Sequence, residues 1–239
     1  MRRLACLYAM VLACGAIAAA PAPDLDQVED LIVRRTNEFR VERGLARVEP
    51  DAALARAARA FADYMARTDQ YGHEADGKKP SERARARGYD YCLVSENISY
   101  QFSSGPFTTA ELARGFVEGW KESPGHRRNM LEPAATDIGA AAARSARTGR
   151  YYAVQMFGRP RAQSVEFTVA NVAKTAVRYR VGEEGYALGP RQARTHTVCA
   201  ADDVIFPAAA NDEGRKIRPS HGDRLQVEGD RRVTVRRER

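Results

Sequence analysis

The chain has 239 residues, which allows one large domain or two small ones, and its net charge at pH 7 is +7. Acidic and basic residues are interspersed, and the first two-thirds of the chain show no basic stripe interleaved with aromatic residues. Because nucleic-acid-binding domains concentrate positive charge in this way, we expect no nucleic-acid partner. The basic stretch 231–239 alternates like a β-strand, which favours a sheet edge or contact with an acidic envelope surface over a DNA-binding arm.

Residues 1–22 have the three-part pattern of a secretory signal peptide. Two arginines precede an uncharged apolar run, residues 4–20, and small residues through Ala22 offer cleavage positions. The run of about 17 residues is at the lower edge of what crosses a bilayer, so we expect cleavage and a mature chain without a transmembrane segment. A weak lipobox at residues 11–14 offers lipid anchoring through Cys14 as the less favoured alternative. Either interpretation predicts export, to the periplasm or out of the cell.

Two of the four cysteines lie in that leader, which leaves Cys92 and Cys199. Exported proteins meet an oxidising compartment, so one possibility is a disulfide that ties the two halves of the chain together. Closing a loop of this length stabilises a fold by roughly 4 kcal/mol. The equal alternative is two separate buried thiols, and the spacing excludes a zinc-finger type of cluster.

The apolar pattern predicts four helices, and extended segments follow them. The helices start near Asp26, Asp51, Pro80, and Thr108 or Thr109. Gly44, Gly88 and Pro124 end the first, third and fourth of them, because glycine and proline interrupt helices. The apolar face of the first helix is expected to hold Val28, Leu31, Ile32, Phe39 and Val41. Residues 138–143 and 151–157 are expected to pair as strands around a turn at 148–149.

After residue 160 the pattern changes to short β-type runs separated by Gly, Pro, Asp and Asn. Their spacing of roughly 8–15 residues is typical of a small all-β sandwich or barrel. We therefore predict an α+β chain with a signal peptide at 1–22, one domain over 25–159, and a β-rich accessory domain over 163–239.

Two histidines about fifty residues apart mark the candidate site. His73 lies in the stretch from Tyr71 to Pro80, His126 lies in the stretch from Trp120 to Leu131, and Glu96 lies between them. Each histidine has glycine or proline turn residues beside it, which favours a site that is assembled in three dimensions from loops.

Four motifs occur in a fixed order over about 130 residues. They are Asn37-Glu38-Phe39-Arg40 with Gly44-Leu45; His73 with Asp76-Gly77, Pro80, Arg83 and Gly88-Tyr89; Glu96-Asn97-Ile98; and Trp120 to Leu131 followed by Asp137-Ile138-Gly139 and Tyr152 to Gly158. On these motifs residues 25–158 resemble the CAP superfamily, the cysteine-rich secretory, antigen 5 and pathogenesis-related 1 proteins, in their bacterial SCP-like form.

The resemblance implies a CAP-type α-β-α sandwich with a cleft that holds two histidines and two glutamates. Carried over by position, His73 and His126 are the histidines and Glu96 is the first glutamate. The position of the second glutamate is Ser123 in this chain, a form that is common in bacterial members. The adjacent Glu122 points elsewhere if the segment is helical, since neighbouring positions differ by about 100°.

These residues fit three kinds of site. Two imidazoles and Glu96 suit Zn²⁺ with an open position, although no closely spaced histidine pair orients them in advance. Ser123, His126 and Glu96 have the composition of a catalytic triad, but no nucleophile elbow surrounds the serine. The third possibility is a hydrogen-bonded network of His73, Glu96, Ser123 and His126 that holds two loops over the sheet. Structural roles are expected for Asn37, Arg40 and Trp120, and backbone bonding for Asn97.

We therefore expect an exported or envelope-associated protein whose His/Glu cleft binds a ligand, such as a lipid or another envelope component. The alternative is a zinc-dependent hydrolase of peptide or envelope polymer, with His73, His126 and Glu96 as ligands or with Glu96 as general base. A purely structural envelope role is the third hypothesis. The sequence decides neither the ligand nor whether the protein is an enzyme.

Overall fold

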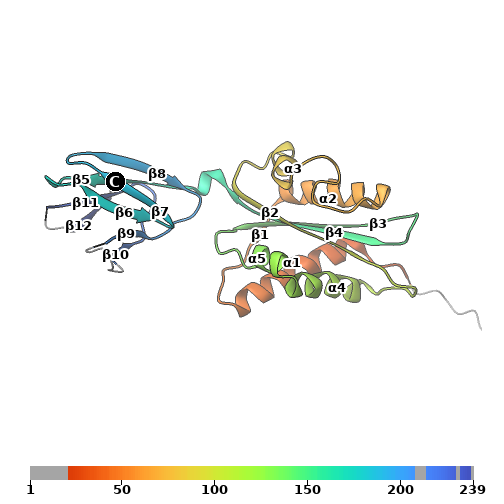
Figure 1. The fold of residues 1–239 in the computed structure, drawn as a ribbon. Helices are drawn as coiled ribbons and strands as arrows, with labels where there is room; N and C mark the ends of the chain where they lie inside the picture. Colours follow the sequence, from red (N-terminus) through yellow and green to blue (C-terminus); the bar gives the residue numbers. More distant parts are fainter. Residues whose placement is uncertain (1–20, 208–213, 230–231, 238–239) are drawn as a thin grey trace, which may run out of the picture.

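A four-stranded sheet lies between two layers of helices in the N-terminal part of the chain (Figure 1). The computed structural model describes residues 21–207, 214–229 and 232–237. The predicted leader, with Cys14, therefore lies almost entirely outside the described residues. The strands are β1 (Glu49–Pro50), β2 (Tyr91–Gln101), β3 (Asp137–Arg144) and β4 (Tyr151–Pro160), in the order β1-β3-β4-β2. The predicted hairpin of β3 and β4 is confirmed as an antiparallel pair.

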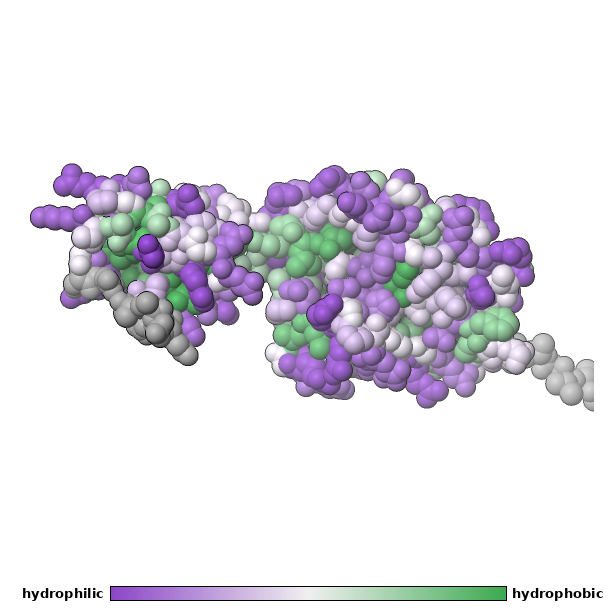
Figure 2. Space-filling model, in the orientation of Figure 1, coloured by the Kyte–Doolittle hydropathy of each residue, from purple (hydrophilic) through white to green (hydrophobic). Residues whose placement is uncertain are grey.

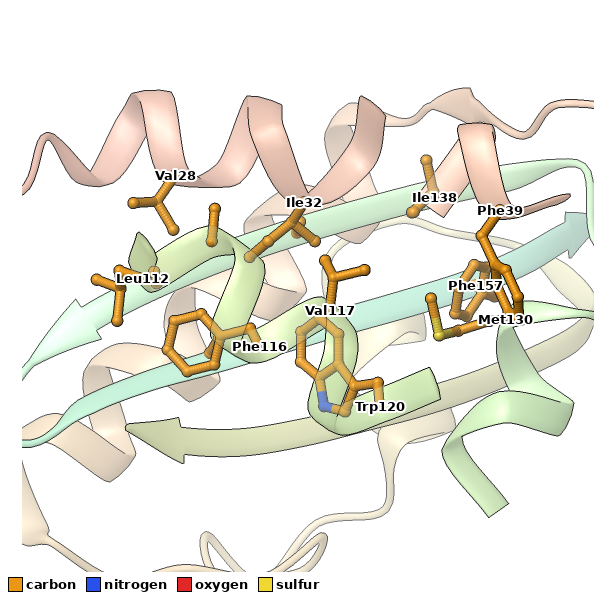
Figure 3. Packing of buried hydrophobic residues seen from close by; sticks show 14 of the residues in the cluster. Val28, Ile32, Phe39, Leu112, Phe116, Val117, Trp120, Met130, Ile138 and Phe157 are labelled. Atoms are coloured by element: carbon orange, nitrogen blue, oxygen red, sulfur yellow. The ribbon is translucent and has the colours of Figure 1, made fainter. Parts of the chain in front are cut away.

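One helical layer consists of α1 (Leu25–Glu42), α4 (Thr109–Glu122) and α5 (Pro124–Met130). Thr108 caps α4 in a capping box with Glu111, which supplies partners for backbone N–H groups that the first turn leaves free. Figure 3 shows side chains from these helices meeting those of β3 and β4 in one cluster. The predicted apolar face of α1 is wrong at Val41, which is exposed because it lies about 200° around the helix from buried Phe39.

The other layer consists of α2 (Ala52–Thr68) and α3 (Pro80–Ala86). Asp51 caps α2 as expected, since its carboxylate accepts from the backbone N–H groups of Ala53 and Leu54. Alternate residues of β3 and β4 face the two layers, so each layer has its own hydrophobic cluster. At Gly139, α2 comes so close to β3 that an added Cβ would lie 2.3 Å from the backbone of Leu54 and Ala55.

In the C-terminal part, the regular elements among the described residues are all strands, apart from the short 3₁₀ helix η1 (Arg161–Gln163) that precedes them. One sheet has the order β12-β11-β5-β8 and the other β10-β9-β6-β7. Their bounds are β5 (Val165–Asn171), β6 (Val177–Val181), β7 (Glu184–Leu188), β8 (Ala193–Val198), β9 (Val204–Phe206), β10 (Arg215–Ile217), β11 (Asp223–Val227) and β12 (Val233–Arg237). A third hydrophobic cluster, drawn entirely from these strands, lies in this part. The predicted α+β class with an all-β C-terminal part is thus confirmed.

A disulfide links the two parts of the chain. It joins Cys92 of β2 to Cys199, across a sequence separation of 107 residues. This decides between the two alternatives for the cysteines. Among the residues that the structure describes, no hydrophobic cluster mixes the two sides of η1. The division into domains at 159 and 163 remains our proposal. On the face shown in Figure 2, the described residues are mostly hydrophilic and the apolar ones form separate groups. No described helix has the length and apolar character needed to cross a membrane.

Candidate functional site

The candidate site is built around β2, an edge strand of the central sheet. Successive residues of a strand face opposite sides, so Glu96 faces the layer of α2 and α3 while Asn97 faces the layer of α4 and α5. The loop between α2 and α3 brings His73 to the first side, and α5 brings His126 to the second. The two imidazole rings lie 6.4 Å apart between centroids, so the edge of β2 is where both helical layers contribute to one surface.

Glu96 holds His73 in place. The Nδ1 atom of His73 lies 2.8 Å from Oε1 of Glu96, and the Glu96 side chain is fully buried whereas that of His73 is 47% exposed. An ionised carboxylate only accepts hydrogen bonds, so Nδ1 carries the proton in this contact. The neutral ring then has its lone pair on Nε2, which makes that atom a hydrogen-bond acceptor.

Arg83 of α3 organises this half of the site. Its guanidinium donates to both oxygens of Glu96, at 3.0 and 2.8 Å, and to Oδ1 of Asp76 at 2.7 Å. It also donates to the backbone oxygens of His73 and Lys78, so a single cation ties the loop to the strand. Because a buried charge is costly unless it is paired and hydrogen-bonded, Arg83 is what allows Glu96 to be buried as a carboxylate.

The backbone of His126 is held on the opposite side of β2, beside Asn97. Asn97 donates to the carbonyl oxygen of His126 at 3.1 Å and to Gln155, and it accepts from Asn129 of α5. Burial lowers the pKa of the His126 imidazole below its ordinary value, and the positive charge of His73 when protonated lowers it further. The lowered pKa favours the uncharged form of the His126 imidazole.

Ser123 does not join His126 and Glu96 in a triad. It is the junction residue between α4 and α5, and within the described part of the chain its hydroxyl has no hydrogen-bond partner. Glu96 bonds His73, not the histidine that follows Ser123 in sequence. The hydrogen bonds of the expected network are therefore limited to His73 and Glu96, joined by Arg83. The hydroxyl of Ser123 takes no part in it, and His126 enters the hydrogen bonding of the site through its backbone oxygen. The neighbouring Glu122 points to a separate hollow of about 490 Å³ beside α5.

The predicted zinc ligands are brought together only in part. Both oxygens of Glu96 are engaged by Arg83, and one of them also by His73, so this carboxylate is not a free third ligand beside two imidazoles. Among residues 21–207, 214–229 and 232–237, no group of three or more His, Cys, Asp and Glu side chains could hold a metal ion. A structural or catalytic zinc site needs at least three protein ligands, and the residues do not fit one.

Two exposed tyrosines extend the site along β2. Tyr71 lies two residues before His73, and its hydroxyl donates to the backbone oxygen of Ile98. Its ring meets that of Tyr100 edge to face, with 5.2 Å between centroids, and the two residues are 48% and 43% exposed. Glu96, Ile98 and Tyr100 alternate along one face of the strand, so the aromatic pair and His73 form a continuous strip, which we call the β2 strip.

The residues expected to be structural have that role. Asn37 exchanges two hydrogen bonds with the backbone of Val48, and the fully buried Arg40 donates to four backbone oxygens. Trp120 is buried, and its indole N–H donates to the backbone oxygen of Ile98. These contacts fix α1, α4 and α5 against the sheet and so position His126 without taking part in the exposed surface.

Comparisons with known proteins give one family and a few relatives. The model of the cysteine-rich secretory protein family, CAP, matches residues 33–157, more than half of the chain. In Bacillus subtilis, the uncharacterized protein YkwD is 31% identical over 112 residues and the uncharacterized membrane protein YlbC is 30% identical over 112. Each match covers 46% of this chain, but only 40% of YkwD and 30% of YlbC, less than half of each relative. An extracellular SCP-domain protein of Bacillus anthracis has a solved structure that is 21% identical, with a TM-score of 0.49, covering 56% of this chain and 41% of that one.

Proposed function

The chain belongs to the CAP family of cysteine-rich secretory proteins, and from this premise we propose that it is an exported, envelope-associated binding protein. Its ligand site is the β2 strip together with His126, and the ligand is a hydroxyl-rich saccharide of the envelope. The observation that carries the proposal is the state of Glu96. Its buried carboxylate is bound by Arg83 and His73, so Glu96 itself is not free to act as a base, while the imidazole of His73 stays exposed.

The hydrogen-bonding character of the site supports a ligand rich in hydroxyl groups. Nε2 of His73 accepts when the ring is neutral, and burial favours the uncharged form of His126. The buried guanidinium of Arg83 donates to Asp76, Glu96 and backbone oxygens. A ligand over the strip therefore meets Nε2 of His73 and the two tyrosine rings, with the Arg150 guanidinium 5.0 Å from the centroid of the Tyr100 ring.

The aromatic pair supports the same class of ligand. The exposed Tyr71 and Tyr100 offer apolar ring surface within the same strip as His73. A sugar has apolar C–H faces and polar hydroxyl edges, which match ring surface beside hydrogen-bond acceptors. Binding sites for small ligands combine aromatic lining with a few polar groups in this way.

The test uses a tetramer of N-acetylglucosamine as the probe and the full mature chain. Calorimetry should detect binding by the unaltered protein. The affinity should fall by at least about tenfold in His73→Ala and in Tyr100→Ala, because one lost contact of this kind can supply the roughly 1.4 kcal/mol that a tenfold change requires. The affinity of His221→Ala should be unchanged. His221 is an exposed histidine of the C-terminal part and serves as the matched control.

Two results would contradict the proposal. Phosphatidylglycerol vesicles that bind the chain, while the tetramer does not, would indicate a lipid ligand. A micromolar Zn²⁺ site in calorimetry that disappears in the His73→Ala/His126→Ala double variant would favour the metallohydrolase.

A further inference from the structure

A groove rich in arginine lies at the opposite edge of the central sheet from the β2 strip. Two hollows of about 470 and 600 Å³ share Arg59, Asp63 and Arg67 as lining residues, so they form one continuous depression along α2. Its remaining lining is mostly alanine from α2 and β3, whose small side chains leave the depression open. From Arg56 to Arg67 the helix rises about 16 Å, the length of a short extended oligomer.

Positive charge outweighs negative charge along this arginine groove. Six arginines line it, Arg56, Arg59, Arg67, Arg87, Arg144 and Arg147, against two acids, Glu29 and Asp63. Arg59 pairs with Glu29 and Arg147 with Asp69, whereas Arg56, Arg67, Arg87 and Arg144 have no ion pair with any described residue. With Glu29 paired to Arg59, Asp63 is the one lining carboxylate left for these four guanidinium groups, so an excess of positive charge remains around the depression. These groups repel one another, and an anionic occupant would relieve that repulsion.

The sheet edge beneath the groove is blocked to a peptide strand. Beyond its pairing with β1, β3 is the outer strand on this side of the sheet. The outward backbone groups of Ala142 are already satisfied, since its N–H donates to Glu29 and its oxygen accepts from Arg59. A peptide could not add to this edge by a continuous ladder of backbone hydrogen bonds. The occupant must be held by the arginine side chains.

From these observations we propose that the arginine groove is a second binding site, for a single extended chain of a carboxylate-bearing polysaccharide. Guanidinium groups bind carboxylates through paired N–H···O bonds, so regularly spaced carboxylates suit several arginines along one helix. Single-stranded nucleic acid is disfavoured because its binding channels stack bases on aromatic rings, and no aromatic residue lines either hollow.

The experiment measures binding of oligogalacturonate to the full mature chain by calorimetry at several salt concentrations. The variant is Arg56→Gln/Arg67→Gln/Arg87→Gln, which removes three exposed, unpaired charges of the groove. The matched control is Arg178→Gln/Arg180→Gln/Arg236→Gln, which removes three exposed charges from the C-terminal part. We expect the groove variant to lose about tenfold or more in affinity and to show a shallower salt dependence, with the control within about twofold of the unaltered chain.

Three results would overturn the proposal. They are no binding of oligogalacturonate at low salt, equal losses in the groove and control variants, and binding of poly-L-glutamate as tight as that of oligogalacturonate. The last would indicate an acidic peptide, and equal losses would indicate attraction to net charge alone. Because the β2 strip lies at the other edge of the sheet, His73→Ala should leave oligogalacturonate binding unchanged. The experiments therefore test this site and the proposed saccharide site independently.

Discussion

Replacing Arg83 by methionine should destabilise the N-terminal part by about 3–5 kcal/mol, the cost of removing one partner of a buried ion pair. Methionine keeps much of the volume of the Arg83 side chain that packs over the Phe61 ring. It removes the hydrogen bonds that the guanidinium donates to Glu96 and Asp76. Glu96, whose side chain is fully buried, would then keep only the contact with His73. The cost therefore comes mainly from an unpaired buried carboxylate.

Chemical denaturation followed by tryptophan fluorescence measures this cost directly. The sequence has one tryptophan, Trp120, which is buried against β2 and so reports on the N-terminal part. Arg85→Met is the matched control, because this exposed arginine of the same helix should change stability by no more than about 0.5 kcal/mol.

A second substitution separates lost charge pairing from lost packing. In the Arg83→Met background, Glu96→Gln removes the unpaired charge and should recover about 1–2 kcal/mol, the penalty that an unsatisfied buried charge carries beyond a neutral amide. An Arg83→Met cost below about 1 kcal/mol, or a double variant no more stable than the single one, would refute the reasoning.

The remaining predictions concern packing, the disulfide and pH. Gly139→Ala should cost at least about 1–3 kcal/mol of stability, because the added Cβ would overlap with the α2 backbone. Gly119→Ala, in open space on α4, should stabilise by about 0.5–1 kcal/mol. Equal effects of the two substitutions in denaturation would contradict the close approach of α2 to β3. Cys92→Ser/Cys199→Ser should cost up to about 4–5 kcal/mol for a loop of 107 residues, and a calorimetric scan with no change would show that the cross-link does not restrict the unfolded chain. Burial lowers the pKa of His196 in the C-terminal part, so the unfolded chain binds a proton at this histidine at a higher pH than the folded chain does. Stability should therefore fall as pH drops below about 6.5 and level off below the folded-state pKa. The same fall in His196→Phe would assign it to other groups.

Elements with local chemical signals could be predicted from the sequence. Asp51 and Thr108 begin helices because their side chains accept from free N–H groups of the first turn, and this chemistry needs no tertiary context. β7 and β10 lack such a local signal. Their residues, such as Arg215 and Lys216, carry little apolar alternation, and these strands exist because β6 and β9 pair with them.

The candidate site shows the same division. The motifs identified His73 and Glu96, which the structure places in contact. The role of Arg83 could not be derived from spacing, because it depends on α3 packing against β2; its one available signal was its place one turn after Pro80 in the same motif. Ser123 was selected by its position in the family pattern. Its hydroxyl has no hydrogen-bond partner among the described residues, so it takes no part in the network of His73, Glu96 and Arg83, and its role toward a ligand stays a prediction.

In the proposed site, Glu96 fixes His73 with its proton on Nδ1 and leaves Nε2 to accept from a ligand. The most direct measurement is a ¹H–¹⁵N spectrum of the imidazole rings in the labelled mature chain at pH 8, with and without the N-acetylglucosamine tetramer. We expect the Nδ1–H tautomer for His73 and a shift of its Nε2 resonance on addition of the tetramer, while His221 stays unchanged. An Nε2–H tautomer for His73, or a spectrum that the tetramer leaves unaltered, would contradict the proposal.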